Sequence, residues 1–331
     1  MSYPLNPDLY NEDVQQEPIR AGFGRGLKAA GELDERVVAL CADLTESTQM
    51  HLFRDAFPER FVQIGIAEQN LVTVASGLAH AGKIPFASSY AAFNPGRNWE
   101  QIRTTAALNN QPVKIVGSHA GVSVGPDGAT HQMLEDIALM RVVPRMVVIA
   151  PGDSVEAEKA TKAMAADNRP SYLRLAREKT PIFSTEESPF EIGKAYVLRE
   201  GNDVTLYGTG TMSYQLLAAA EELGKSGISA EVVHVPTIKP LDEATILESV
   251  RKTGRAVSAE EAQAAAGFGG AIAELLSEKL PTPLKRIGMK DRFGESGAPT
   301  ELIDHFGFTG TKIAAEVTIW LQNTPKYHQG F

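Results

Sequence analysis

The glycine-rich segment 118–132 carries three side chains that could do chemistry, His119, Asp127 and His131. It follows a continuous apolar run at 113–116, which predicts a loop at the end of a buried strand. Glycine lets a backbone approach a ligand closely, and a long loop is costly to bury unless its polar groups find partners. A polar ligand would explain the segment. A metal ion is the rival explanation, which the lack of a compact ligand spacing disfavours.

Glu68 stands at the entrance to a segment in which apolar residues follow helical spacing. A carboxylate there is favoured by the helix dipole, and this explanation requires no function. The alternative is a buried acid that hydrogen-bonds a ligand nitrogen, since burial would raise its pKa and allow it to share a proton. The pattern alone leaves both explanations open.

Two aromatic residues, Tyr90 and Phe93, are spaced to face one side of a helical turn. Core packing is the ordinary role of such side chains. A wall on which a flat heterocycle stacks is the functional alternative.

Alternating strands and helices must position these side chains. Strands covered on both faces are nearly continuous in apolar residues, and five such runs occur. Helical spacing separates them, and Asp153 with Glu156 resembles a capping box that opens a helix over 155–165. The alternation predicts a doubly wound, mainly parallel α/β sheet whose carboxyl edge carries the candidate residues, where such sheets bind ligands. The predicted strands are 37–41, 61–64, 113–116, 146–150 and 172–175.

A polar, proline-containing stretch at 180–189 predicts a linker, after which a smaller α/β domain follows. We therefore divide the chain into domains 1–185 and 192–331. In the second domain we expect strands at 204–207, 230–235, 256–259 and 284–287, with helices near 214–223, 243–252 and 270–279.

We predict no site residue in the second domain. The glycines at 267–270 lack a full nucleotide-binding fingerprint and predict a tight turn before a helix. Three histidines are expected to be structural or at the surface: His234, His305 and His328.

The composition restricts partner and compartment. With 331 residues and a net charge of −9, the chain lacks the basic excess that nucleic acid requires. Its single cysteine, Cys41, fits a reducing compartment. The first ten residues are polar and could form an arm, and neither a signal pattern nor a membrane-spanning run is seen, so we expect a cytoplasmic protein.

Four motifs, in this order, resemble the pyrimidine-binding domain of transketolases: IGIAEQN (64–70), SSYAAF (88–93), GPDGATHQ (125–132) and YLRLAR (172–177). The sequence after about residue 192 is similar to the transketolase carboxy-terminal domain. The resemblance implies a thiamine-diphosphate-binding sheet of the pyrimidine type followed by that smaller domain. It also implies transfer of a two-carbon ketol unit from a ketose phosphate to an aldose or aldose phosphate.

The resemblance assigns cofactor contacts to four residues. Glu68 would contact the aminopyrimidine nitrogen of thiamine diphosphate and promote its imino tautomer, which makes it a catalytic residue. Tyr90 and Phe93 would line the aminopyrimidine pocket, and Asp43 would lie close to the cofactor.

Sugar contacts are implied in the same way. The catalytic residues that hold the hydroxyls and phosphate end of the sugar would be His119, Asp127 and His131. The substrate phosphate would meet Arg177, whose planar fork suits such an anion, together with Ser47 and His131. Arg174 is a weaker second candidate.

One departure from the family pattern decides the quaternary prediction. Full-length transketolases hold the cofactor's metal with a Gly-Asp-Gly motif, which this sequence lacks. We predict no metal ligand in this chain, and Mg²⁺ or Ca²⁺ bound mainly by a partner. That partner would be an amino-terminal transketolase subunit with the diphosphate motif, in an α2β2 assembly.

Three related enzymes and one non-enzyme remain as alternatives. Synthases of 1-deoxyxylulose phosphate typically have arginine where His119 stands, and β subunits of 2-oxoacid dehydrogenases lack GPDGATHQ. A split transketolase for a branched ketose phosphate is a third possibility. A non-catalytic regulatory subunit would have lost chemical residues, yet Glu68, Asp127 and Arg177 are intact.

Overall fold

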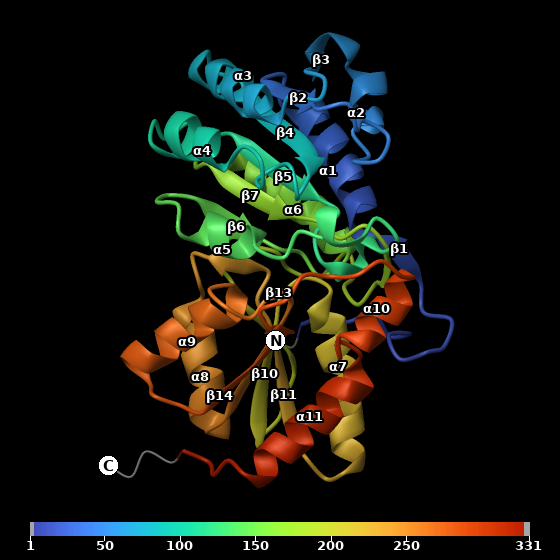
Figure 1. Cartoon of the computed structure of the whole chain (residues 1–331), viewed down its shortest axis with the longest axis vertical. Coiled ribbons are helices and arrows are strands. Elements are labelled where there is room, and N and C mark those ends of the chain that lie inside the picture. The colour runs from blue at the N-terminus through green and yellow to red at the C-terminus, as the bar shows by residue number, and fades with distance from the viewer. Residues whose placement is uncertain (1–2, 328–331) are drawn as a thin grey trace.

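The computed structural model describes residues 3–327 and consists of two α/β halves, one above the other in Figure 1. The upper half is built on a seven-stranded sheet of order β12-β6-β7-β5-β4-β2-β3. Its strands are β2 (Val37–Cys41), β3 (Phe61–Gln63), β4 (Ile84–Tyr90), β5 (Lys114–Ser118), β6 (Val147–Ile149), β7 (Ser171–Arg174) and β12 (Thr237–Lys239).

Six strands of this sheet run parallel, and the edge strand β12 is antiparallel to β6. β12 comes from the second half of the sequence, where Thr237 pairs with Ile149. A strand from the carboxy-terminal part of the sequence therefore forms the edge of the upper sheet. No single point in the sequence separates the residues of one sheet from those of the other.

Residues alternate between two apolar cores, because successive side chains of a strand point to opposite faces. Val37 and Ala39 of β2 pack with α1 and α6, whereas Val38 and Leu40 pack with α3 and α5. The helices of this half are α1 (Ile19–Leu33), α2 (His51–Ala56), α3 (Glu68–His80), α4 (Trp99–Gln101), which continues as a π-helix (Ile102–Ala107), α5 (Asp136–Arg141) and α6 (Ser154–Ala166). The sheet is thus covered on both faces, as its continuous apolar runs predict.

The lower half contains a five-stranded sheet of order β14-β13-β10-β11-β9, in which only β9 is antiparallel. Helices α7 and α11 lie side by side on one face, with α8 and α9 on the other (Figure 1). The strands are β9 (Tyr196–Arg199), β10 (Val204–Gly208), β11 (Ala230–His234), β13 (Ala256–Gln263) and β14 (Leu284–Met289). The helices are α7 (Met212–Lys225), α8 (Glu243–Thr253), α9 (Phe268–Lys279), α10 (Pro299–His305) and α11 (Gly310–Gln322).

The predicted α/β architecture is confirmed, and most predicted strands and helices are present. Among the elements that the sequence pattern did not predict are β4, β9 and β12, with the helices α1, α2, α5, α10 and α11. The pattern also placed Tyr90 and Phe93 on a helical turn, which is wrong: Tyr90 ends strand β4 and Phe93 lies in the turn that follows. β4 contains a proline and two serines, so it lacks the continuous apolar run of its neighbours.

The amino-terminal segment is not a free arm over its described part. Leu9 and Tyr3 are buried, and Asn6 donates from its side chain to the carbonyl of Ile182 (2.8 Å). Strand β1 (Gln16–Pro18) pairs with β8 (Lys179–Pro181), whose last two residues belong to the stretch predicted as a linker. The polar composition of this segment suggested a free arm, but burial of its apolar side chains holds it against the rest of the protein.

Asp153 caps α6 by accepting a hydrogen bond from the Glu156 N–H (2.9 Å), as expected. The Glu156 side chain does not complete the capping box, since it accepts from the Gly152 N–H (2.7 Å) and contacts His234 Nε2 (2.7 Å). His234 also contacts Ser213 through Nδ1 (2.6 Å), and its side chain is fully buried between the two halves. His234 is thus structural, whereas His305 is exposed and His328 lies outside the described residues.

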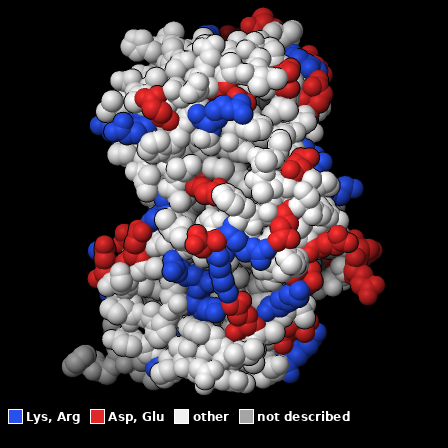
Figure 2. Space-filling view, viewed as in Figure 1, with Lys and Arg blue, Asp and Glu red and all other residues white. Residues whose placement is uncertain are grey.

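Two surface properties complete the description. On the face in Figure 2, Lys and Arg side chains are interspersed with Asp and Glu. Within residues 3–327, every helix is too short or too polar to span a bilayer.

Candidate functional site

Strand register brings most of the predicted site residues to one edge of the first sheet. Tyr90 and Ser118 are paired where β4 and β5 end, so His119 follows directly beside Tyr90. Strand β7 is the next neighbour of β5, and Arg177 lies three residues beyond its end. The parallel arrangement therefore gathers segments that are far apart in the sequence, as expected for a carboxyl edge.

Aromatic rings form a continuous wall at this edge. The Tyr90 and His119 rings are stacked with centroids 3.8 Å apart and an interplanar angle of 24°. Tyr90 and Phe93 are also nearly parallel, at 6.2 Å and 17°. His131 meets Phe93 edge-on at 5.5 Å. This geometry is consistent with the alternative of a stacking wall. The wall is formed by the end of strand β4 and the turn after it, not by a helical turn.

Glu68 is the first residue of α3, and its side chain is only 2% exposed. Its carboxylate makes no helix-capping hydrogen bond; Oε2 instead accepts from Arg97 Nη1 (2.6 Å). Arg97 in turn lies over the Phe93 ring, with its guanidinium carbon 4.5 Å from the centroid. Glu68 and Arg97 also line a hollow of about 460 Å³ together with the exposed Ile66. The acid is therefore connected to the aromatic wall through one arginine.

His119 is buried and adopts a positive φ of 58°. Arg20 Nη1 lies 3.1 Å from its Nε2, and because arginine can only donate, Nε2 must accept and Nδ1 carry the proton toward Ser118 Oγ (2.9 Å). Burial, reinforced by the charges of Arg20 and Arg177, lowers the pKa of His119 to about 3. The imidazole is therefore neutral at physiological pH, with a fixed tautomer.

Arg177 is half-buried and donates from Nη1 to the carbonyl of Val124 in the 118–132 loop (2.5 Å). Its positive charge also contributes to the lowered pKa of Arg20, where burial is the larger cause. Two guanidinium groups and the His119 ring are thus grouped at one place, which favours an anionic ligand.

Three further predicted residues contribute less to this cluster. Ser47 uses its backbone, since its carbonyl accepts from Arg20 Nη1 (2.9 Å). Asp43 and Asp127 are exposed, and within residues 3–327 neither carboxylate has a hydrogen-bond or ion-pair partner. The structure therefore gathers Glu68 and the histidines but leaves both aspartates at the surface.

Sequence reasoning missed two arginines of the cluster, Arg20 and Arg97. Arg20 is the second residue of α1, where a cation opposes the helix dipole, and this unfavourable position was a signal of function. Arg97 had no such signal, because a fold-dependent turn brings it to Glu68. Arg174 is a structural residue instead: it is buried and pairs with Asp136 (2.8 Å).

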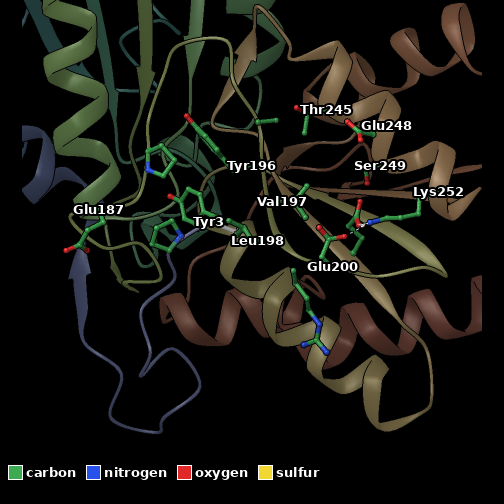
Figure 3. Close-up of a pocket in the computed structure, with 15 residues that line it drawn as sticks. Tyr3, Glu187, Tyr196, Val197, Leu198, Glu200, Thr245, Glu248, Ser249 and Lys252 are labelled. Atoms are coloured by element: carbon green, nitrogen blue, oxygen red, sulfur yellow. Dashed lines mark hydrogen bonds and ion pairs between the residues drawn. The ribbon is translucent and has the colours of Figure 1, made fainter. Parts of the chain in front are cut away.

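A larger hollow lies elsewhere. This cavity has a volume of about 1140 Å³ and lies between β9, α8 and the amino-terminal segment. Figure 3 shows the residues that line it. Tyr3 and Tyr196 contribute to its lining, with ring centroids 5.2 Å apart, and Lys252 there pairs with Glu200 (2.5 Å). None of the predicted site residues line it, so it is separate from the aromatic wall.

Comparison with known proteins gives two family matches. Residues 16–182 match the transketolase pyrimidine-binding domain, and residues 193–313 match the transketolase C-terminal domain. A putative transketolase C-terminal section from Methanocaldococcus jannaschii is 45% identical over 302 residues, which cover 90% of this chain and 95% of that protein. The 6-deoxy-6-sulfo-D-fructose transketolase subunit SqwH of Clostridium sp. (strain MSTE9) is 43% identical, covering 86% and 89%.

Solved structures agree with the family matches. A split-gene transketolase, described as an inactive β4 tetramer, superimposes with a TM-score of 0.87 and 42% identity, covering 93% of this chain and 99% of that one. The transketolase of Campylobacter jejuni has a TM-score of 0.79 and 25% identity, and the match covers 94% of this chain but 50% of that enzyme. The chain therefore belongs to the transketolase family and corresponds to the carboxy-terminal section of a split transketolase.

Proposed function

We propose that this chain is one of the two subunits of a thiamine-diphosphate-dependent transketolase and works only with an amino-terminal partner. The reaction breaks the C2–C3 bond of a ketose phosphate, releases an aldose phosphate and joins the two-carbon ketol unit to an aldose or aldose phosphate. The observation that carries the proposal is the buried Glu68 carboxylate beside the aromatic wall of Tyr90 and Phe93.

The donor groups of this chain fit the pyrimidine end of thiamine diphosphate. Of the two carboxylate oxygens of Glu68, only Oε2 has a hydrogen-bond partner within residues 3–327, so Oε1 is available to a ring nitrogen. Glu68 would hold a proton at that nitrogen, while Tyr90 and Phe93 would stack against the flat ring. The cofactor, when bound, supplies the electron sink for cleavage of the carbon–carbon bond.

The sugar would meet the neutral His119, His131 and Arg177. Both nitrogens of the neutral His119 ring already have partners in Arg20 and Ser118, so a sugar hydroxyl would bond to His119 by replacing one of them. The guanidinium of Arg177 can bind the phosphate. Ser47 and Asp127 remain candidates for the phosphate end and for a hydroxyl, and Asp43 for a place near the cofactor. These assignments rest on the grouping of the two arginines with His119.

The partner subunit would cover the open side of the site. Ile66 is 76% exposed beside Glu68 and lines the same hollow, as a residue awaiting an apolar surface would. Within residues 3–327, no group of three or more His, Cys, Asp and Glu side chains could hold a metal ion. We therefore assign the Mg²⁺ or Ca²⁺ and the diphosphate anchor to the amino-terminal subunit. The two kinds of subunit would form an α2β2 assembly, in which this chain contributes two domains, 1–185 and 192–331.

Reconstitution tests this proposal. The chain is mixed with the Gly-Asp-Gly-containing subunit from the same source, thiamine diphosphate and Mg²⁺, and assayed with xylulose 5-phosphate and ribose 5-phosphate. Ketol transfer should require both subunits. Transfer by this chain alone would contradict the proposal, as would inactivity of the mixture with every ketose tried.

A second donor deserves its own arm of the assay, because one relative is a 6-deoxy-6-sulfo-D-fructose transketolase subunit with 43% identity to this chain. A sulfonate is also an anion that Arg20 and Arg177 could bind. Faster transfer from the sulfonated ketose than from xylulose 5-phosphate would assign the chain to that substrate class.

A further inference from the structure

The 118–132 loop has little regular structure of its own to fix its shape. It contains two single-turn 3₁₀ helices, Val122–Val124 and Gly128–Thr130. His119, Gly121 and Gly125 have positive φ values of 58°, 90° and 88°. Such a backbone is not held by local hydrogen bonding alone, so contacts from outside the loop must define its conformation.

The second domain supplies one of these contacts through Glu261, near the end of β13. This side chain is 2% exposed, and its Oε1 accepts a hydrogen bond from the Ser123 N–H (2.6 Å). Its Oε2 accepts from Thr211 Oγ1 (2.9 Å), which fixes the carboxylate from the other side. At Gly121, a Cβ atom would lie 2.3 Å from Oε1, so the glycine makes this close approach sterically possible.

Ser123 is linked through the next residue to Arg177, the proposed phosphate-binding arginine. Val124, the next residue, offers its carbonyl to Arg177 Nη1 at 2.5 Å. A shift of Ser123 would therefore move the group that orients the guanidinium. On the opposite side of the loop, Gln132 Nε2 donates to the carbonyls of Val122 (3.0 Å) and Glu295 (2.8 Å), so a second anchor also comes from the second domain.

We infer that Glu261 is a positioning residue of the active site: it holds the 118–132 loop in its binding conformation and, through Val124, orients Arg177 toward the anionic end of the sugar. The second domain then contributes to donor binding as well as to the fold. The part of this inference that concerns the sugar rests on the proposed function, whereas the part that concerns the loop does not.

Glu260 provides a matched control. It precedes Glu261 on the same strand, is equally buried at 1% exposure, and also accepts backbone hydrogen bonds. Its donors are the N–H groups of Phe268 (2.7 Å) and Gly269 (2.8 Å) at the start of α9. Glu260→Gln therefore perturbs a buried carboxylate of the second domain and leaves the loop contact intact.

Hydrogen exchange on the isolated chain tests the loop contact without any activity. In Glu261→Ala, amides of the peptide 119–132 should exchange at least about tenfold faster than in the wild type, since an N–H that loses its partner opens more readily. Glu261→Asp keeps the charge but shortens the reach, and should loosen the same peptide; it decides the question if the alanine variant does not fold. Unchanged exchange in the loop, or equal loosening in Glu260→Gln, would overturn the inference.

Kinetics of the reconstituted enzyme test the link to the sugar. Glu261→Asp should raise KM for the phosphorylated donor about tenfold, the equivalent of one hydrogen bond to a charged group, with kcat changed less than about twofold. Glu261→Gln retains an acceptor oxygen and should restore KM. A loosened loop with an unchanged KM would overturn the role in donor binding. An inactive wild-type assembly would instead count against the proposed function, and hydrogen exchange would still decide the loop contact.

Discussion

The imidazole of His119 lies on the phenol ring of Tyr90, with ring centroids 3.8 Å apart. This stack follows from the register of β4 and β5, in which Tyr90 pairs with Ser118. It ties the cofactor side of the proposed site, Tyr90, to its sugar side, His119. Tyr90→Phe keeps the ring and should change the free energy of unfolding by less than about 0.5 kcal/mol, whereas Tyr90→Leu should cost about 1 kcal/mol more. Urea denaturation of the three proteins measures this, and equal stability of the Phe and Leu variants would contradict the stack.

The buried His119 should make stability depend on pH. Burial lowers its pKa to about 3, while the unfolded imidazole binds a proton near pH 6.5. Between these values the unfolded state binds more protons, so the folded state loses stability as pH falls from about 6.5 toward about 3. Between pH 6 and 4, the wild type should lose up to about 1.4 kcal/mol per pH unit more than His119→Gln. Parallel stability curves in this range would show that His119 is not held neutral.

The ion pair of Arg97 with Glu68 should also contribute to stability. Arg97→Gln leaves a buried carboxylate with a weaker donor, and should lower the free energy of unfolding by about 1 to 3 kcal/mol near neutral pH. Arg103→Gln, on the neighbouring π-helix, is the control for removing an arginine. If Arg97→Gln lowered the free energy of unfolding no more than Arg103→Gln, the Arg97–Glu68 ion pair would not contribute to stability.

His234 should hold the two halves together. His234→Ala would leave Glu156, which is 1% exposed, without its imidazole partner, and should cost about 3 kcal/mol. His305→Ala removes a histidine that is 54% exposed and should change stability by less than about 0.5 kcal/mol. Thermal unfolding by calorimetry compares the two variants. Similar midpoints would contradict the structural role of His234.

Much of the architecture could be predicted because parallel strands buried on both faces have continuous apolar sequences, as in 37–41 and 172–175. Strand β4 was missed because its serines and proline interrupt that pattern, and β12 because a three-residue edge strand is too short to leave one. The short helix α10 lies at the end of a polar loop and gave little periodic signal. Local pattern thus predicted the sheet's interior better than its edges.

The candidate site divides in a similar way. Glu68 and His119 could be identified because each follows a predicted strand at the carboxyl edge, whereas Tyr90 was identified from its motif alone, since its strand β4 was not predicted. Arg97 and Glu261 could not, since their contacts with Glu68 and Ser123 span 29 and 138 residues of sequence and depend on tertiary structure. The prediction that the second domain holds no site residue is the one that Glu261 challenges.

The central claim is that Glu68 completes a thiamine site shared with another chain. The most direct measurement compares ketol transfer by the wild type and by Glu68→Ala, each assembled with the amino-terminal subunit and saturated with thiamine diphosphate and Mg²⁺. We predict that kcat of the variant falls by at least about 100-fold, the usual scale of a lost proton-transfer group, while the assembly still forms. A variant that assembles and keeps a kcat near that of the wild type would contradict the claim.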